Sequence, residues 1–210
     1  MTKSNHMKRL VIIAVVFGIC LSGCSESRLA NKSTDSFAKL PNHVINKSAL
    51  FYDTKTSTWT LNGELYSGYV ASFYPDKTPK ERFGVLNGRK QNVAIYWNED
   101  GYYRYIAHYH KGKLDGTKKT WSGDSSHQLL SQLNYVAGKL HGVQIQWYPS
   151  GELYKKLNMN MGREEGLQQG FRKNGVLYAN YEARGGRIYG LKKAKLCYGL
   201  EDENIKTAGD

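Results

Sequence analysis

The stretch that decides the fold runs Gly138-Lys139-Leu140-His141-Gly142-Val143-Gln144-Ile145-Gln146-Trp147-Tyr148-Pro149-Ser150-Gly151. Its middle part, Val143 to Trp147, alternates apolar and polar side chains, which is the period of a strand with one buried face. Ser150-Gly151 then supplies a turn signal. The stretch therefore predicts a β-strand that leads into a hairpin, with the apolar side chains on its buried face.

The same pattern recurs along the chain from about residue 61 in a fixed phase. One register consists of Gly68, Asn92, Gly116, Gly142, Gly166 and Gly190, with spacings of 24, 24, 26, 24 and 24 residues. A second lies four residues upstream in five copies, namely Gly88, Gly112, Gly138, Gly162 and Gly186, whereas Gly63 is one residue out of step. An aromatic residue lies five positions beyond the first register, at Phe73, Trp97, Trp121, Trp147 and Phe171. Such phasing indicates tandem copies of one structural unit.

Each unit reads as a β-hairpin. Asp100-Gly101 and Asn174-Gly175 favour two-residue hairpin turns, which need positive φ. The return strands carry pairs of side chains two residues apart, and each pair is expected on one face: Phe83 and Val85, Ala107 and Tyr109, Leu133 and Tyr135, Leu157 and Met159, Tyr181 and Ala183. The two glycines four residues apart would form the connection into the next unit. A helix is disfavoured, because interior glycines cost about 1 kcal/mol each.

The predicted fold is all-β, an elongated antiparallel sheet of about five hairpin units within residues 49–191, with residues 192–210 as a C-terminal cap. Composition agrees with this prediction. The 210 residues include 16 Tyr, 6 Phe, 4 Trp and 22 Gly but only 4 Pro. So many aromatic residues argue against disorder, and three cysteines argue against a disulfide scaffold.

The N-terminal residues have the composition of an export signal. Lys3, Lys8 and Arg9 precede an apolar run from Leu10 to Cys20, which is too short to span a bilayer as a helix. The tetrad that follows, Leu21-Ser22-Gly23-Cys24, resembles the lipobox of bacterial lipoproteins. This resemblance implies cleavage after residue 23 and acylation of Cys24, and Ser25 implies sorting to the outer membrane, facing the periplasm. The alternatives are a non-lipidated signal peptide or a short membrane anchor and, for the location, another membrane of the cell envelope or secretion.

Residues 24–48 have the composition of a flexible tether. Cleavage after residue 23 would remove three basic and no acidic side chains, which lowers the formal charge from +12 to +9. Cys197 would then be the only free thiol, so no internal disulfide is expected.

The repeat resembles the MORN family in its bacterial variant, found in proteins labelled YwqK-type antitoxins. The matching segments are Gly88 to Asn92 with Tyr96 to Gly101, Gly112 to Gly116, Gly138 to Gly142 with Trp147 to Gly151, and Gly162 to Gly166 with Asn174-Gly175. The resemblance covers about residues 61–191, and Asn92 and the irregular Gly63 copy depart from it. It implies an elongated stack of antiparallel hairpins and, as one functional possibility, an antitoxin or immunity partner of a toxin.

Catalytic motifs are scarce, so we expect no catalytic residues and no cofactor. No serine lies in a Gly-x-Ser-x-Gly turn and no phosphate-binding glycine loop occurs. His108 and His110, two residues apart on a strand, could ligate a metal, but we expect cross-strand packing instead. Cys197 could act as a redox or copper ligand, but a small apolar role is expected. A metal- or thiol-dependent enzyme therefore stays the less favoured alternative.

The aromatic residues suggest both a core and a binding surface. The tryptophan column is expected to pack as a core ladder. A single-layer sheet would leave one face in water, and a candidate aromatic and basic surface on it consists of Tyr96, Tyr103, Tyr105, Tyr148, Lys119 and Lys155. We expect a non-enzymatic binding or scaffold protein, anchored in the bilayer through Cys24, that recognises a protein or an envelope component but no nucleic acid. The sequence leaves the oligomeric state open.

Overall fold

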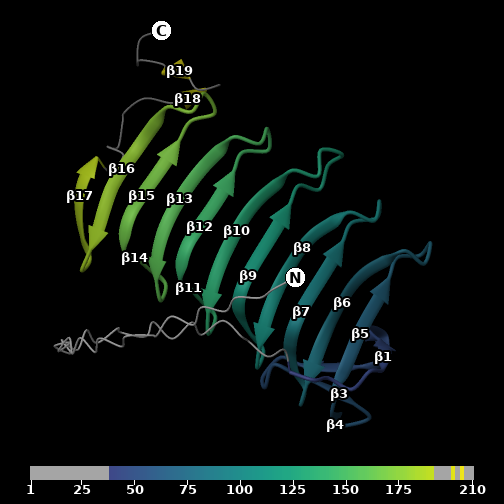
Figure 1. The fold of residues 1–210 in the computed structure, drawn as a ribbon. Helices are drawn as coiled ribbons and strands as arrows, with labels where there is room; N and C mark the ends of the chain where they lie inside the picture. Colours follow the sequence, from purple (N-terminus) through teal and green to yellow (C-terminus); the bar gives the residue numbers. More distant parts are fainter. Residues whose placement is uncertain (1–37, 192–199, 202–203, 206–210) are drawn as a thin grey trace, which may run out of the picture. The chain divides into compact units, whose positions relative to one another are not determined.

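The computed structural model describes residues 38–191, 200–201 and 204–205. A 14-stranded sheet dominates it, and its strands follow one another in chain order as hairpins (Figure 1). The five long hairpins are β5 (Gly68–Phe73) with β6 (Pro79–Leu86), β7 (Arg89–Trp97) with β8 (Tyr103–His110), β9 (Lys113–Trp121) with β10 (Leu129–Val136), β12 (Gly142–Trp147) with β13 (Leu153–Asn160), and β15 (Gly166–Phe171) with β16 (Leu177–Arg184). The predicted all-β array of antiparallel hairpins is confirmed.

Short strands complete this sheet. β1 (Val44–Asn46) pairs parallel with β5 at one end, and β17 (Arg187–Leu191) pairs with β16 at the other. The two-residue strands β11 (Lys139–Leu140) and β14 (Arg163–Glu164) extend β10 and β13 beyond their pairing with β12 and β15. Separately, β18 (Leu200–Glu201) and β19 (Asn204–Ile205) form a two-stranded hairpin.

Two kinds of turn alternate along the sheet. The sequence predicted two-residue turns at Asp100-Gly101 and Asn174-Gly175, and this assignment is wrong, because the two-residue turns lie at the other ends of the strands. Both central residues have positive φ in the turns at Asn87-Gly88, Lys111-Gly112, Ala137-Gly138, Met161-Gly162 and Gly185-Gly186. We call these the short turns. The turns that contain Gly101, Gly151 and Gly175 have three-residue loops instead. In the first of these, the Gly101 N–H donates to the Asn98 C=O (3.1 Å) and the Asn98 N–H to the Tyr102 C=O (2.8 Å). Only one residue of such a loop needs positive φ, and we call them the long turns.

The first glycine register also follows from backbone conformation. Its members all have positive φ, from +64° at Asn92 to +146° at Gly68. Asparagine tolerates this region better than most residues, so Asn92 fits the repeat. Its side chain has a second role, because Nδ2 donates to the Ala38 C=O (2.8 Å) and Oδ1 accepts from the Ala38 N–H (3.2 Å).

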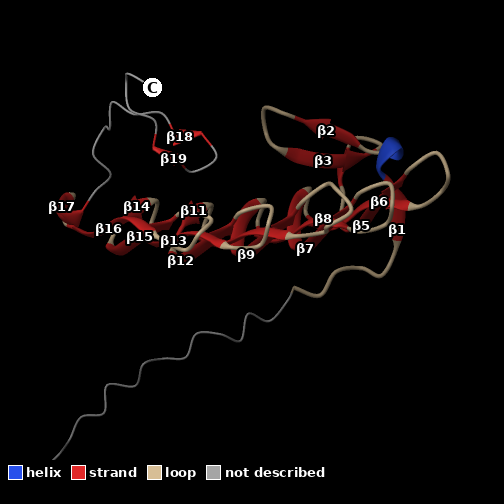
Figure 2. Ribbon diagram, turned by 90° about the horizontal axis from the view of Figure 1, so that it is seen from above, coloured by secondary structure: helices blue, strands red, loops and turns tan. Residues whose placement is uncertain are grey.

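A small second sheet covers one end of the large one. It consists of β2 (Phe51–Asp53), β3 (Thr58–Leu61) and β4 (Glu64–Leu65), and a short 3-10 helix, η1 (Lys47–Ala49), precedes it. Figure 2 shows β2 and β3 as a layer over the β5 to β8 end. Trp59 of β3 packs on Phe83 with ring centroids 5.4 Å apart, and Val70, Phe83, Val85 and Ala94 beneath are at most 1% exposed. The out-of-step Gly63 lies in the β3–β4 turn of this small sheet.

The large sheet therefore has two unlike faces. The stacked face carries Val70 and Phe83 and, by strand alternation and pairing, all the side-chain pairs predicted to share a face. The opposite face carries Trp97, Trp121 and Trp147, and we call it the tryptophan face. On the stacked face, two polar side chains are fully buried: Gln144 at 1% and Gln168 at 0% exposure. The prediction that the apolar side chains of Val143 to Trp147 form the buried face is thus wrong.

Each buried glutamine pairs with a strand backbone where the regular ladder is interrupted. The Oε1 of Gln144 accepts from the Asn134 N–H (2.7 Å), and its Nε2 donates to the Asn134 C=O (3.2 Å) and the Gly142 C=O (3.0 Å). Gln168, one repeat later, makes the same contacts with Asn158 and Gly166. The glutamines therefore replace main-chain hydrogen bonds between neighbouring hairpins.

Only part of the N-terminal region for which the sequence makes predictions lies among the described residues. The predicted tether 24–48 is wrong for residues 38–48, because Leu40 is 8% exposed, its Cδ1 lies close to Gly84, and β1 and η1 are ordered elements. The signal peptide, Cys24 and Cys197 lie outside the described residues. No helix among the described residues has the length and apolar character needed to cross a membrane.

Candidate binding surfaces

The aromatic column lies at the long-turn ends of the strands, on the tryptophan face. Tyr103 lies between Trp97 and Trp121, with ring centroids 6.2 and 5.7 Å away. Tyr103 is 46% exposed and Phe73, at the start of the column, is 52% exposed, whereas the tryptophans are half-buried. The predicted core role of this column is therefore wrong, because the hydrophobic core lies on the other face.

A β-bulge next to each long turn directs these aromatic side chains. The pairing register shifts just before Phe73, Trp97, Trp147 and Phe171. A bulge re-aims the side chains next to it and increases the local strand twist. Tyr103 consequently pairs with Trp97 on the tryptophan face, while Tyr105, two residues later, pairs with Tyr96 on the stacked face.

Two of the predicted surface tyrosines lie on the stacked face and are engaged there. Tyr96 and Tyr105 stack with centroids 4.1 Å apart, and Lys90 Nζ donates to the Tyr96 hydroxyl at 2.9 Å. The Lys90 ammonium also lies 4.6 Å from the Phe83 ring centroid and 5.3 Å from that of Tyr109. Burial lowers the pKa of Lys90 and raises the pKa of Tyr109 to about 12. The ammonium group of Lys90 thus occupies the space between these aromatic rings, where a cationic ligand could otherwise bind.

The other three predicted residues are dispersed. The Tyr148 hydroxyl donates to the Phe171 C=O (2.9 Å) and its ring lies 4.8 Å from that of Tyr154. Lys155, on the stacked face, lies 4.6 Å from the Tyr154 ring. Lys119 is exposed on the tryptophan face, opposite Ile106. The prediction of one surface formed by all six residues is wrong, because strand alternation and bulges divide them between two faces.

His108 occupies a repeated structural position. Its Nδ1 lies 2.7 Å from the Thr117 C=O, so it is the protonated nitrogen in this contact. Asn134 and Asn158, the equivalent residues of the next two repeats, donate from Nδ2 to the corresponding carbonyls of Val143 and Leu167. His110 Nδ1 lies 3.3 Å from Gln91 Nε2. No group of three metal-ligating side chains occurs among the described residues.

A histidine in the longest turn has an unusual environment. The His127 ring stacks on Tyr102 with centroids 3.2 Å apart, and its Nδ1 is buried with no partner within the described part of the chain. His127 also has a positive φ of +48°. No sequence signal marked this stacking.

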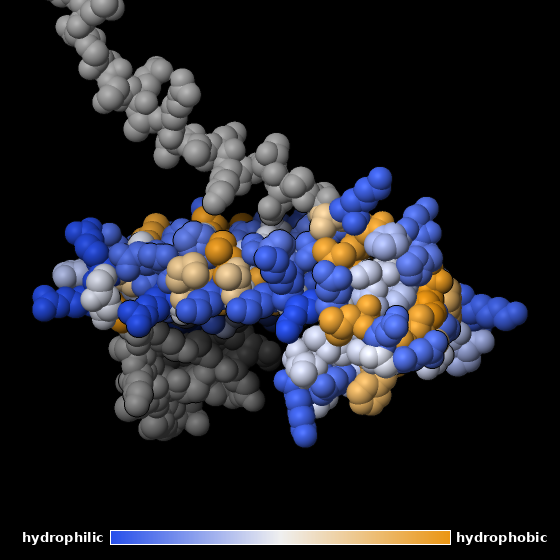
Figure 3. All heavy atoms as spheres, turned by 90° about the horizontal axis from the view of Figure 1, so that it is seen from below, coloured by the Kyte–Doolittle hydropathy of each residue, from blue (hydrophilic) through white to orange (hydrophobic). Residues whose placement is uncertain are grey.

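A row of basic side chains, which sequence reasoning missed, follows the short turns. Each of five strands begins with a basic residue directly after the turn glycine: Arg89, Lys113, Lys139, Arg163 and Arg187. We call this set the basic ladder. Figure 3 views the sheet from its short-turn edge, where hydrophilic surface extends along the row of strands. The signal was present in the sequence as a cation at one fixed position of every unit.

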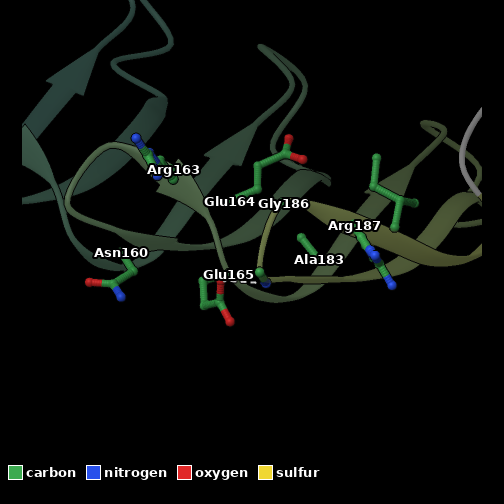
Figure 4. A pocket seen from close by; sticks show the side chains of 9 residues that line it. Asn160, Arg163, Glu164, Glu165, Ala183, Gly186 and Arg187 are labelled. Atoms are coloured by element: carbon green, nitrogen blue, oxygen red, sulfur yellow. Dashed lines mark hydrogen bonds between the residues drawn. The ribbon is translucent and has the colours of Figure 1, made fainter.

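A hollow of about 470 Å³ lies between the last two short turns. Arg163 and Arg187 line it together with Asn160, Glu164 and Glu165 (Figure 4). Glu165 Oε2 accepts from the Gly185 N–H (3.4 Å), and Glu164 Oε1 accepts from the Tyr181 hydroxyl (2.9 Å). The lining of the hollow therefore includes cations and hydrogen-bond acceptors, together with the apolar side chains of Ala183 and Ile188.

Comparison with known proteins gave no family, no curated protein and no solved structure that matches this chain.

Proposed function

We propose that the protein is an exported, lipid-anchored, non-enzymatic binding protein that holds a protein or envelope ligand on the tryptophan face of a MORN-like sheet. The observation that carries this proposal is the half-exposed aromatic column, of which Tyr103 and Phe73 are 46% and 52% exposed. Large aromatic side chains with one face in water supply contact area at low entropic cost, and they are enriched in binding sites.

The regular spacing of the column supports an extended ligand. The aromatic positions recur once per hairpin, which is about 9.6 Å at two strand spacings. Exposed basic side chains on the same face, Lys119 and Lys156, add donors and positive charge between these aromatic positions. The acylated Cys24 of the sequence prediction would restrict this surface to the neighbourhood of a membrane.

The proposal can be tested by affinity capture from solubilised cell envelope with the full chain as bait. A Tyr103→Ala/Trp121→Ala variant should fail to retain a partner that the wild type retains. Phe51→Ala is the matched control, because Phe51 is 69% exposed but lies on β2 of the small sheet. Equal recovery with the double variant would refute binding by this face, and recovery of a toxic enzyme would identify the immunity form of the proposal.

A further inference from the structure

We infer that the basic ladder binds an extended anionic polysaccharide, one that carries a carboxylate about once per disaccharide. The inference is independent of the proposed role of the aromatic column, because the ladder lies at the opposite ends of the strands. It concerns the short-turn edge alone.

The ladder has the same geometry in every unit. Each cation occupies the first residue of a strand and pairs with the last residue before the short turn, as in Leu86↔Arg89, Val136↔Lys139 and Arg184↔Arg187. All five side chains are exposed, and none makes an ion pair within the described residues. We call each cation of the basic ladder a rung. Because successive rungs are two strands apart, they recur about every 9.6 Å, and five rungs extend over about 38 Å.

The turn glycines hold the side-chain stems in line. A Cβ atom placed on Gly112 would lie 3.6 Å from the Cβ of Arg89, and one on Gly138 would lie 3.7 Å from the Cβ of Lys113. Each stem thus lies beside the turn of the following unit. Stems confined in this way lose less entropy when their charged ends bind a ligand.

The positive charge is specific to this edge of the sheet. The short turns and the two residues on either side of each carry eight basic residues against one acidic residue, Glu164, the basic set being Arg89, Lys90, Lys111, Lys113, Lys139, Arg163, Arg184 and Arg187. The long-turn segments carry five of each, with Asp76, Glu99, Asp100, Asp124 and Glu152 balancing Lys77, Lys80, Arg104, Arg172 and Lys173. A general surplus of lysine would not separate the two edges in this way, so the edge itself is suited to an anion.

The hollow between the last two rungs favours a sugar polymer over a phospholipid surface. Its lining adds the carboxylates of Glu164 and Glu165 and the amide of Asn160 to the two arginines, and Figure 4 shows Asn160 and Glu165 pointing to one side and Glu164 to the other. Carboxylates accept hydrogen bonds from sugar hydroxyls but repel closely spaced phosphates. At this end of the ladder, cations with hydrogen-bond acceptors beside them match a chain that alternates charged and neutral sugars.

The test measures binding of the detergent-solubilised full-length protein to hyaluronan oligosaccharides of increasing length at low salt. We expect affinity to rise with length until the sugar spans five rungs, because each further contact is intramolecular, and to fall as salt is added. The Lys139→Glu/Arg163→Glu variant should bind about ten-fold more weakly or worse. Lys77→Glu/Lys173→Glu is the matched control, with the same change in net charge at two exposed residues of long turns, at the opposite ends of the strands.

Four results would overturn the inference: no binding of hyaluronan, an affinity independent of its length, an equal loss in the control variant, or tighter binding to phosphatidylglycerol vesicles than to the polymer. Circular dichroism melting of each variant identifies any loss that comes from unfolding. The Tyr103→Ala/Trp121→Ala variant should keep its hyaluronan affinity, so failure of the ladder and failure of the aromatic column are distinguishable.

Discussion

Single side chains form hydrogen bonds with main-chain groups at positions where the regular hydrogen bonding between neighbouring strands is interrupted. Gln144 and Gln168 are the clearest cases, since each satisfies both the N–H and the C=O of an asparagine on the neighbouring hairpin. His108 has a related role, in which an imidazole replaces the asparagine amide of later repeats. These polar residues are structural, although their types suggest a site.

Replacing Gln168 by leucine should lower the free energy of unfolding by about 1–3 kcal/mol, because the Asn158 N–H would lose the Gln168 acceptor and the Asn158 C=O would keep only the Glu165 N–H (3.0 Å). Urea denaturation measures the effect. Gln169→Leu is the matched control, since Gln169 lies on the opposite face and its replacement should change stability by much less. Equal losses in the two variants would contradict this role.

Glu81 links η1 to the large sheet through Lys47 and should make stability depend on pH. Burial alone would raise the pKa of Glu81, but hydrogen bonds from Lys47 (2.6 Å) and Ser72 (2.8 Å) and the Lys47 charge outweigh burial and lower it. A depressed folded-state pKa contributes stability above the ordinary glutamate value of about 4.3, and this contribution is lost as the pH falls through the folded pKa.

Denaturation at several pH values tests this account. Glu81→Gln should reduce the loss of stability between about pH 5 and pH 3. Lys47→Gln keeps the carboxylate but removes its partner, which raises the folded-state pKa of Glu81, so this variant should be less stable than the wild type above about pH 5 and should lose less stability on acidification. Identical acid profiles for all three proteins would be inconsistent with the pair.

At the scale of the hairpin, turn chemistry is set by backbone conformation more than by residue identity. Lys77 has φ of +70° at the long-turn position where Gly101, Gly151 and Gly175 occur in other units. A residue with a Cβ atom is strained there by about 1–2 kcal/mol. The hairpin between β5 and β6 therefore forms in spite of its turn residue.

Lys77→Gly should accordingly raise the free energy of unfolding by up to about 1 kcal/mol, since relief of strain exceeds the added entropy of the unfolded chain. Lys80→Gly, in strand β6, is the control and should destabilise the protein. Thermal denaturation distinguishes the two. A lower melting temperature for Lys77→Gly would show that the lysine side chain contributes more than its strain costs.

The sequence predicted the hairpins, the placement of their turns and the shared face of pairs such as Phe83 and Val85, because glycine phasing and two-residue alternation are local signals. It did not predict which face is buried. That depends on where β2, β3 and β4 pack, and on bulges that place Tyr103 and Tyr105 on different faces. Gln144 looked like an outward polar residue, because only the interrupted ladder beside it shows why an amide is buried there.

At the scale of the whole sheet, stability should be graded from one end to the other. The β5 to β7 end carries the second layer and the fully buried Val70, Phe83 and Val85. Toward β16 and β17 most side chains are half-buried or exposed. Because hairpins in such an array contact mainly their neighbours, local openings need not involve the whole sheet.

Hydrogen exchange should therefore show the slowest amides in β5 to β7 and progressively faster ones toward β17. Phe83→Ala should cost about 3–5 kcal/mol at the two-layer end, with a much smaller change in exchange at β13 to β16. Uniform acceleration across all strands would instead indicate a single cooperative unit. Leu167→Ala, at a side chain that is 45% exposed, provides the mild reference substitution.

The hydrogen bonds between successive short turns have one more consequence, for how such a sheet could change in length. The N–H groups of Gly112, Gly138 and Gly162 donate to the carbonyls of Lys90, Leu114 and Leu140, each in the preceding unit, at 2.7 to 2.8 Å. A duplicated unit inserted in the middle would find the same donor and acceptor above and below it. Duplication of one unit in the gene could thus lengthen the sheet by two strands at a time, while the elements at both ends of the sheet stayed unchanged.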